Sequence, residues 1–382
     1  MVNHVLSGVD QLPAFLPSLR GCRVGLMTNP TGIDHQFRST IDLVFREGCL
    51  SALFAVEHGI RGMQQAGDAV GNTTDPVTNV TVYSAYGTAS HFTEEMLNAF
   101  DTLIFDMQDV GARFYTYLYS LSYAMIACAR AGKRIIVLDR VNPLGGEKRS
   151  GTILDSAFAS FVGNYELPTQ YGLTIGEYAR YVKWYLNLNL DMTILPLRGW
   201  KRSMLLSDTD LPWVAPSPNC PDLAAALCYT GTCIFEGSNI SEGRGTTQPF
   251  QLVGAPFLNA NLLADRMNAL NLEGIHFRPA AFVPTFSKYQ GEVCHGVQMH
   301  ITDPLVCDTF AGGLLLMDEI RRQAGNAFSF LRWNQDPKYA IDKLMGTDVY
   351  RTGKKSAMEV IEEGRAGIRK FSQTVQPCLL YS

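Results

Sequence analysis

The sequence has neither an excess of positive charge nor a long apolar run. Its 382 residues include 32 lysines and arginines against 36 aspartates and glutamates, which gives a formal net charge of −4. Because nucleic acids and anionic membranes bind proteins through basic clusters, we expect neither as a partner. No stretch of about 18 apolar residues occurs, so we predict no transmembrane helix. Residues 1–20 lack the basic start of a secretory signal, which favours a cytoplasmic protein.

The short motifs of metal-dependent and cofactor-dependent enzymes are also missing. The nine cysteines include no CxxC pair, and the sequence contains no HExxH zinc motif, no GxGxxG dinucleotide motif and no P-loop. The GxSxG motif of α/β-hydrolases is absent as well. We therefore predict reduced cysteines, no metal, and no nucleotide or other cofactor.

The first 150 residues alternate short apolar runs with segments of helical spacing. The predicted strands are residues 23–28, 53–56, 80–83, 102–105 and 134–138, and the predicted helices are residues 39–48, 93–100 and 115–131. Continuous apolar strands that alternate with helices are typical of a parallel sheet covered on both faces. The pattern predicts an α/β fold in which residues 1–150 form a Rossmann-like domain.

A stretch rich in glycine and charge at residues 145–152 marks the predicted domain boundary. Beyond it, Thr174 with Glu177 three residues later forms a capping box at the start of a helix over residues 174–186. Further strands are predicted at residues 192–196, 277–286 and 293–302, and helices at residues 259–270, 310–323 and 357–371. Residues 151–382 are thus predicted to form a second α/β domain.

Polar side chains follow several of the predicted strands. Open parallel sheets bind ligands beyond the carboxyl ends of their strands. A single aspartate at such a place is commonly a turn former, but four strand ends with polar groups together indicate a site. The residues concerned are Asn29, Glu57, His58, Asp106, Asp109, Asp139 and Arg140.

A second polar segment, residues 235–250, lies between two apolar runs. It contains Glu236, Asn239, Glu242 and Arg244 among three glycines, and we name it the acidic loop. Glycine lets a ligand approach the backbone closely, and polar loops between buried flanks are typical of small-molecule sites. The alternative is a solvated surface loop.

These two regions supply carboxylates, arginines and aromatic rings. Paired carboxylates in one cleft are suited to acetal hydrolysis, in which one donates a proton and the other stabilises or attacks the sugar or activates water. Arginines can bind an anionic substrate group, and aromatic rings can stack on a sugar face. The candidates are Arg61, Arg113 and Arg244 for the first role and Phe114, Tyr115 and Tyr117 for the second. The alternative for the aromatic residues is a core helix.

Five motifs together resemble the NamZ family of exo-β-N-acetylmuramidases, once known only as a domain of unknown function. The motifs are residues 56–62, 106–117, 138–144, 217–219 and the acidic loop, and the likeness runs from about Gly25 to the C-terminus. The resemblance implies a Rossmann-like domain beside a smaller α/β domain, with the site in the cleft between them. It also implies removal of terminal N-acetylmuramic acid from the non-reducing end of peptidoglycan fragments, without metal or nucleotide.

The resemblance further suggests roles for individual residues. Glu57 is expected to be one catalytic carboxylate, the general acid, and Glu242 the second, with Glu236 as its substitute. The expected substrate contacts are Asn29, His58, Arg61, Asp106, Asp109, Arg113, Tyr115, Asp139, Arg140, Asn219, Asn239 and Arg244. Tyr171 stands where the family pattern has histidine, and Cys220 where it has methionine, so the substrate rim is expected to differ.

Several alternatives stay open at this level. A non-catalytic protein that binds sugars or muropeptides has the same two-lobed design, and a hydrolase of another anionic amino sugar has the same groups. The substrate is expected to be a small molecule, a muropeptide or a disaccharide fragment, and a cytoplasmic enzyme would act on imported fragments of the wall. The sequence sets neither the oligomeric state nor the stereochemistry of hydrolysis.

Overall fold

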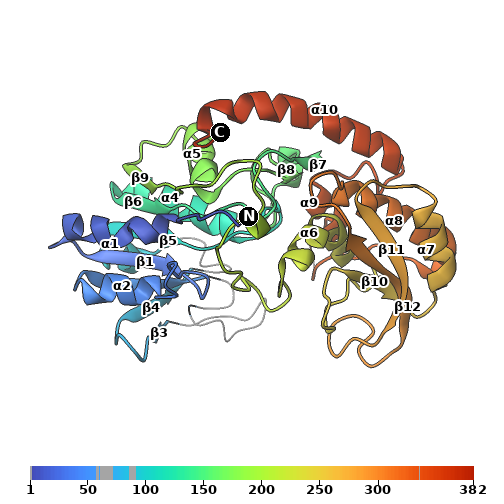
Figure 1. The fold of residues 1–382 in the computed structure, drawn as a ribbon, viewed down its shortest axis with the longest axis horizontal. Helices are drawn as coiled ribbons and strands as arrows, with labels where there is room; N and C mark the ends of the chain where they lie inside the picture. The colour runs from blue at the N-terminus through green and yellow to red at the C-terminus, as the bar shows by residue number, and fades with distance from the viewer. Residues whose placement is uncertain (1, 57–59, 61–71, 86–91, 335) are drawn as a thin grey trace.

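The computed structural model describes residues 2–56, 60, 72–85, 92–334 and 336–382, which form two lobes (Figure 1). The first lobe is built on a seven-stranded sheet and the second on a three-stranded sheet. The predicted α/β class with a Rossmann-like domain is confirmed. Among the described residues, no helix is both long enough and apolar enough to cross a membrane.

The first lobe has the strand order β3-β4-β2-β1-β5-β6-β9. All neighbours pair in parallel except β3, which is antiparallel to β4. The strands are β1 (Val24–Thr28), β2 (Leu50–Ala55), β3 (Thr73–Thr74), β4 (Thr81–Ser84), β5 (Thr102–Asp106), β6 (Arg134–Leu138) and β9 (Met192–Leu195). The helices are α1 (Leu12–Phe15), α2 (Thr40–Arg46), α3 (Glu94–Asn98), α4 (Tyr117–Ala131) and α5 (Ile175–Tyr185).

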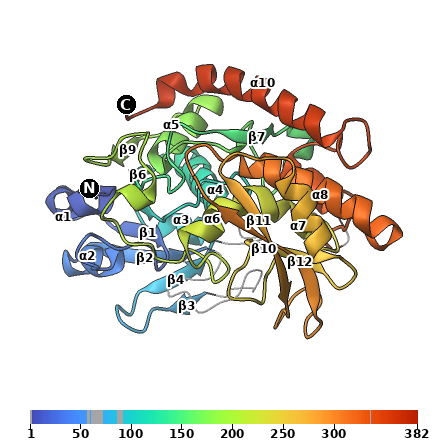
Figure 2. The same ribbon diagram turned by 45° about the vertical axis from the view of Figure 1, so that its right-hand side comes forward.

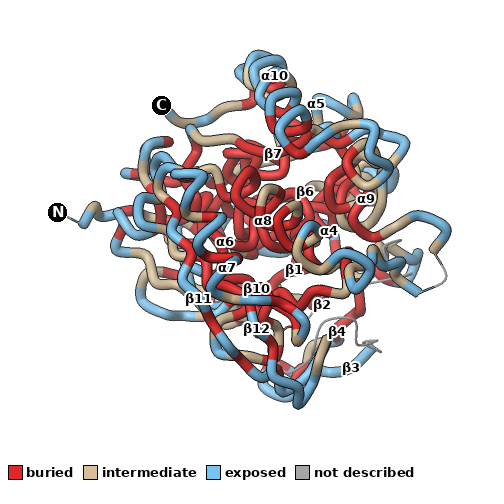
Figure 3. The backbone as a smooth tube through the Cα atoms, turned by 90° about the vertical axis from the view of Figure 1, so that its right-hand side faces the viewer, coloured by how far each residue is buried: buried red, intermediate tan, exposed pale blue. Residues whose placement is uncertain are grey.

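Side chains of the central strands alternate between two apolar cores, one on each face of this sheet. In β1, Leu26 belongs to the cluster that contains Val44 of α2, whereas Met27 belongs to the cluster that contains Leu118 and Met125 of α4. Every residue of β1 and β5 is buried. In Figure 3, buried residues gather in the middle of the molecule. This two-sided burial is the reason that these strands read as continuous apolar runs.

Local signals in the sequence set the helix ends. Ser39, Thr93 and Thr174 cap α2, α3 and α5 with their side chains, and Glu177 completes the predicted capping box. Gly132 ends α4 in the left-handed conformation, with a φ of 63°.

The first lobe extends beyond the predicted boundary at residue 150. Strand β9 pairs with β6, with Ile194 beside Val137, and so adds an edge to the large sheet. Two further strands, β7 (Ser150–Ile153) and β8 (Pro168–Gln170), form a separate antiparallel ribbon. The predicted boundary assigned residues 151–195 to the second domain. In the structure, these residues form no sheet with the second lobe.

The second lobe has the antiparallel strand order β10-β12-β11. Its elements are α6 (Leu223–Thr232), β10 (Leu252–Ala255), α7 (Ala260–Asn268), β11 (Ile275–Phe282), β12 (Cys294–Ile301), α8 (Thr309–Ala324) and α9 (Ala340–Met345). Helices α6 and α8 cross where Gly313 meets Gly231: a Cβ atom on Gly313 would lie 2.1 Å from the Gly231 carbonyl oxygen. Glycine at this crossing lets the two backbones touch.

The C-terminal helix α10 (Ala357–Val375) connects the lobes. It runs across the molecule above β7 and α5 (Figures 1 and 2). The tail beyond it binds the first lobe, where the Tyr381 hydroxyl donates to Asp139 Oδ2 at 2.5 Å and the Leu380 amide donates to Glu177 Oε1 at 2.9 Å. The end of the chain is thus fastened to the edge of the first sheet.

Candidate active site

The acidic loop begins directly after α6 and is mostly buried. A 3-10 turn, Cys233–Gly237, carries Glu236, and backbone bridges then join Ser238 to Phe330 and Ser241 to Gly254. The Phe250 amide closes the loop by donating to the Glu242 carbonyl oxygen at 2.7 Å. The segment is irregular, as predicted, but it is not the solvated surface loop of the alternative, because the neighbouring strands and turns anchor it.

Two carboxylates and two cations meet in this loop. Arg244 donates through Nη2 to Glu236 Oε1 at 2.6 Å, and its Nε lies 3.4 Å from Glu242 Oε1. Lys288 Nζ donates to Glu242 Oε2 at 2.9 Å. The structure thus brings together the three charged residues predicted in the acidic loop, Glu236, Glu242 and Arg244, and adds Lys288.

Lys288 was not predicted, because it lies in the connection between β11 and β12 and no local pattern marks it. Its ammonium group also donates to the carbonyl oxygens of Phe235 at 2.8 Å and Ile240 at 2.9 Å. An ammonium group with three acceptors around it is fixed in position. Lys288 therefore both balances the charge of Glu242 and fixes the shape of the loop.

Electrostatics hold Arg244 in its charged form. Burial would lower the pKa of Arg244, but the neighbouring Glu236 and Glu242 carboxylates raise that pKa above its ordinary value. Arg244 Nη1 makes no hydrogen bond within the described residues. Because 22% of the side chain is exposed, this nitrogen is a candidate donor to an anionic ligand.

An aromatic cluster connects this charged group to the first lobe. The Arg244 guanidinium lies over the Phe250 ring at 5.0 Å, and Tyr229 lies edge-on to Phe250 at 4.6 Å. Tyr229 in turn meets Tyr115, whose ring centroid is 6.0 Å away. The Tyr115 hydroxyl is buried, and the Tyr115 ring also lies edge-on to Tyr117, with the centroids 4.8 Å apart. The predicted contact Tyr115 and the predicted contact Arg244 thus belong to one connected cluster.

The predicted residues at the ends of β1, β5 and β6 also meet. Arg140 forms a forked pair with Asp106, with distances of 2.6 Å from Nε and 2.9 Å from Nη2, and the Thr40 hydroxyl donates to the same carboxylate at 2.5 Å. Asn29 accepts from the Thr31 hydroxyl at 2.6 Å, whereas its own amide nitrogen is buried without a partner in the described structure. Arg140 and Asp106 are buried and satisfy each other, so the pair holds the strand ends together.

Asp109 is fully buried beside the same strand ends. Its Oδ1 accepts hydrogen bonds from the Gly111 amide at 2.7 Å and from the Tyr171 hydroxyl, while its Oδ2 has no partner among the described residues. Burial raises the pKa of Asp109 to about 7, although these two donors oppose the shift. Tyr171, which stands where the family pattern has histidine, thus donates a hydrogen bond to the Asp109 carboxyl group.

Arg113 and Asp139 have hydrogen-bond partners inside the protein. Arg113 is fully buried and donates to the carbonyl oxygens of Thr152, Leu167 and Leu344, and burial lowers its pKa to about 10. Asp139 accepts from the Gly176 amide at 2.7 Å and from Tyr381. Their polar atoms join segments of the chain, and their predicted substrate contacts stay predictions.

The two predicted asparagines differ. Asn239 uses its side chain to fasten the acidic loop to a neighbouring segment, through the Ala327 carbonyl oxygen at 2.7 Å and the Ser329 amide at 2.9 Å. Its predicted role as a substrate contact stays a prediction. Asn219 is buried in the connection that leads into α6, where its backbone amide donates to Ser217 Oγ at 3.3 Å. Its predicted contact stays a prediction.

Three predicted residues, Glu57, His58 and Arg61, lie outside the described residues. The structure follows β2 and its continuation to Val56, at the carboxyl edge of the sheet. Their predicted roles, including that of Glu57 as general acid, stay predictions. In the described ranges, one group of side chains lies close enough together to hold a metal ion, and it consists of His4, His35 and Asp210.

Comparison with known proteins defines the class. Residues 24–224 match the family model described as exo-β-N-acetylmuramidase NamZ, N-terminal, and residues 227–381 match its C-terminal counterpart. The chain is a glycoside hydrolase of two family domains, whose models divide it at the start of α6.

The similarity to individual proteins extends over the full chain. The chain is 43% identical over 383 residues to the peptidoglycan β-N-acetylmuramidase NamZ of Bacillus subtilis strain 168, covering 99% of this chain and 91% of that protein. Two crystal structures of DUF1343 family proteins from Bacteroides fragilis NCTC 9343 are similar, with TM-scores of 0.90 and 0.77, at 32% and 29% identity, each covering 99% of both chains. The chain belongs to the NamZ family of exo-β-N-acetylmuramidases.

Proposed function

We propose that this glycoside hydrolase removes terminal N-acetylmuramic acid from the non-reducing end of peptidoglycan fragments. The observation that carries the proposal is the partly buried group of Glu236, Arg244, Glu242 and Lys288, which adjoins an aromatic cluster reaching the first lobe. The B. subtilis relative, named as a peptidoglycan β-N-acetylmuramidase, supports the choice of substrate.

The two glutamates of the acidic loop differ in what they offer to the reaction. Glycoside hydrolysis needs one group that donates a proton and a second that carries negative charge beside the developing oxocarbenium ion or activates water. Arg244 and Lys288 both interact with the carboxylate form of Glu242, so Glu242 is suited to the second role. Glu236 is the more accessible of the two, with 20% of its side chain exposed against 2% for Glu242. The general acid in this proposal is Glu57.

Arg244 accounts for the preference for muramic acid in this proposal. N-acetylmuramic acid differs from N-acetylglucosamine by a lactyl group, which ends in a carboxylate. The free Nη1 edge of Arg244 provides a charge-assisted donor for that carboxylate, while Glu236 and Glu242 hold the other edge in place. A sugar without the lactyl group would leave this donor unpaired, which lowers its affinity.

Two substitutions test the roles of the carboxylates. Turnover of a chromogenic β-N-acetylmuraminide should fall about 10²–10⁴-fold in Glu242→Gln if this carboxylate acts on the reacting centre. Glu236→Gln should lower turnover as well, by a smaller factor if Glu236 chiefly positions Arg244. Binding of the sugar should persist in both variants.

Glu319→Gln is the matched control. Glu319 is also buried and ion-paired, with Arg266 and Arg322, but it lies on α8 and outside the acidic loop. It should lose stability without losing turnover per folded molecule. Equal turnover in Glu242→Gln and Glu319→Gln would contradict the proposed chemistry. Sugar binding without any turnover in the unsubstituted protein would instead leave a binding protein.

A further inference from the structure

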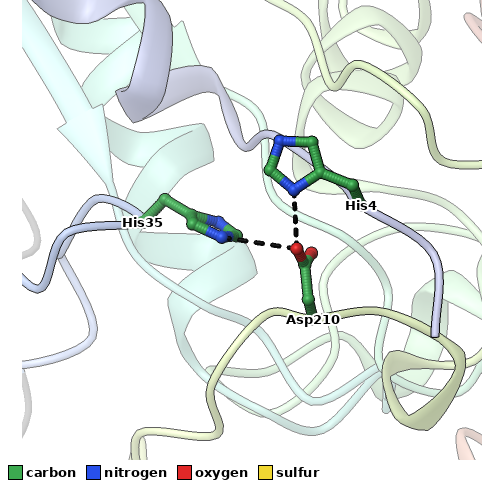
Figure 4. Close-up of side chains that lie close together, drawn as sticks. All are labelled: His4, His35 and Asp210. Carbon is green, nitrogen blue, oxygen red and sulfur yellow. Dashed lines mark hydrogen bonds and ion pairs between the residues drawn. The ribbon is translucent and has the colours of Figure 1, made fainter.

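Three side chains from distant parts of the sequence meet on the first lobe (Figure 4). His4 lies in the N-terminal segment, His35 in the turn after β1, and Asp210 in the connection after the short 3-10 turn at Leu206–Asp208. Asp210 Oδ2 is 2.6 Å from His4 Nδ1 and 3.4 Å from His35 Nε2. The three ligand atoms all lie within 4.8 Å of one another.

The backbone around this cluster aims the carboxylate at the two imidazoles. Asp210 Oδ1 accepts from the Val5 amide at 2.9 Å, which leaves Oδ2 pointing to the histidines. The Asp210 amide donates to the Asn3 carbonyl oxygen at 3.0 Å, and the His35 amide donates to Asp10 Oδ1 at 2.7 Å. Each of the three ligand-bearing segments is therefore held by a hydrogen bond independent of the cluster.

We infer that His4, His35 and Asp210 form a binding site for a divalent transition-metal ion of the zinc type. Two imidazole nitrogens and one carboxylate oxygen suit Zn²⁺, whereas Mg²⁺ and Ca²⁺ prefer oxygen ligands alone. With metal–ligand bonds of about 2.0–2.1 Å, neighbouring ligands of a tetrahedral site stand about 3.3 Å apart. The separation of 3.4 Å between His35 and Asp210 already fits this value.

His4 is the ligand that adjusts. Its 2.6 Å hydrogen bond to Asp210 has to open by about 0.7 Å to reach the spacing of a tetrahedral site. Its side chain is 66% exposed and packs on the edge of the His35 ring, so little packing opposes this movement. On this exposed side, a bound ion would be open to solvent at a fourth position.

A metal ion bound by these three residues would cross-link the N-terminal segment to the rest of the first lobe. His4 and Asp210 are 206 residues apart in sequence. Nearby, the backbone and side-chain amides of Asn3 both donate to the Asp208 carbonyl oxygen. An ion that binds the folded chain and not the unfolded one raises the melting temperature in proportion to the logarithm of its concentration. The site would thus act on stability, apart from the acidic loop.

The test is titration of the full chain with Zn²⁺ by calorimetry, with Mg²⁺ as a second probe. One Zn²⁺ should bind per chain, Mg²⁺ should not bind, and Zn²⁺ should raise the melting temperature. Asp210→Asn and His35→Asn should each weaken Zn²⁺ binding at least tenfold and abolish the thermal shift. Circular dichroism without metal verifies that the variants are folded.

His276→Asn is the matched control, because His276 lies opposite His300 on β11 and β12 and forms the competing histidine pair. It should bind Zn²⁺ like the unsubstituted chain. Absence of Zn²⁺ binding in the unsubstituted chain would overturn the inference and leave His4, Asp210 and His35 as a hydrogen-bonded group. Retained binding in Asp210→Asn, or loss of binding in His276→Asn, would overturn it equally.

Discussion

Replacing Lys288 by methionine should destabilise the protein, because it removes one of the two cations that face Glu242. The substitution keeps the length of the side chain but loses three charge-assisted hydrogen bonds, to Glu242, Phe235 and Ile240. Glu242, which is 2% exposed, would keep only Arg244 at 3.4 Å. A buried carboxylate with a missing partner is costly, since its desolvation is no longer offset.

The magnitude follows from the burial of the two partners. Removing one member of a fully buried ion pair costs about 3–5 kcal/mol. The Lys288 side chain is 21% exposed, and Arg244 stays in place, so the expected loss of unfolding free energy is reduced to about 2 kcal/mol. Lys354→Met provides the comparison, because Lys354 forms an exposed pair with Asp348 whose loss should cost less than about 1 kcal/mol.

Denaturant unfolding followed by circular dichroism measures both variants beside the unsubstituted chain. The unfolding midpoint should fall clearly in Lys288→Met and hardly at all in Lys354→Met, with the slope of the transition unchanged. Equal midpoints for the two variants would refute the view that Lys288 balances a buried charge. They would show that water reaches Glu242 and screens it.

Three further predictions concern the fold. Tyr381→Phe should lower the unfolding free energy by about 1–2 kcal/mol, because the Tyr381 hydroxyl donates to Asp139. As the control, Tyr123→Phe, at a half-buried ring of α4, should change the unfolding free energy by no more than about 0.5 kcal/mol in the same assay. Burial raises the folded-state pKa of Asp139 to about 7. The folded state then binds more protons than the unfolded state between about pH 4 and 7, so the unfolding free energy should decline as the pH rises through this range. In Asp139→Asn this decline should be smaller. An identical pH profile of the unfolding free energy in the variant would contradict the shift. Gly313→Ala should lower the unfolding free energy by about 1–3 kcal/mol, since the new methyl group would lie 2.1 Å from the Gly231 carbonyl oxygen. Thermal unfolding measures this loss, and an unchanged melting temperature would show that the α6–α8 crossing relaxes.

Local chemistry explains how far the sequence predicts the fold. Caps such as Ser39, Thr93 and Gly132 act within a few residues, so the helix ends they mark could be predicted. Continuous apolar runs likewise identified the parallel strands. The pairing of β9 with β6 was missed, because a long connection separates Val137 from Ile194 in the sequence and no local pattern shows that the two strands are neighbours.

The candidate site divides in the same way. Glu236, Glu242 and Arg244 belong to one short segment and could be predicted together. Lys288 reaches Glu242 from a separate turn, and only the folded chain shows that contact. Arg113 donates to three backbone carbonyl groups inside the protein, and the polar motif around it gives no sign of these contacts. Burial of a charged group depends on tertiary packing, which a single motif does not encode.

The most direct test of the proposed function compares hydrolysis of a chromogenic β-N-acetylmuraminide with hydrolysis of the matching β-N-acetylglucosaminide. Both sugars present the same glycosidic bond and acetamido group, and only the first carries the lactyl carboxylate proposed to bind Arg244. The account predicts release from the muraminide alone. Equal release from both would show a broader hexosaminidase in which Arg244 does not select the substrate. Release from neither would contradict the proposed activity itself.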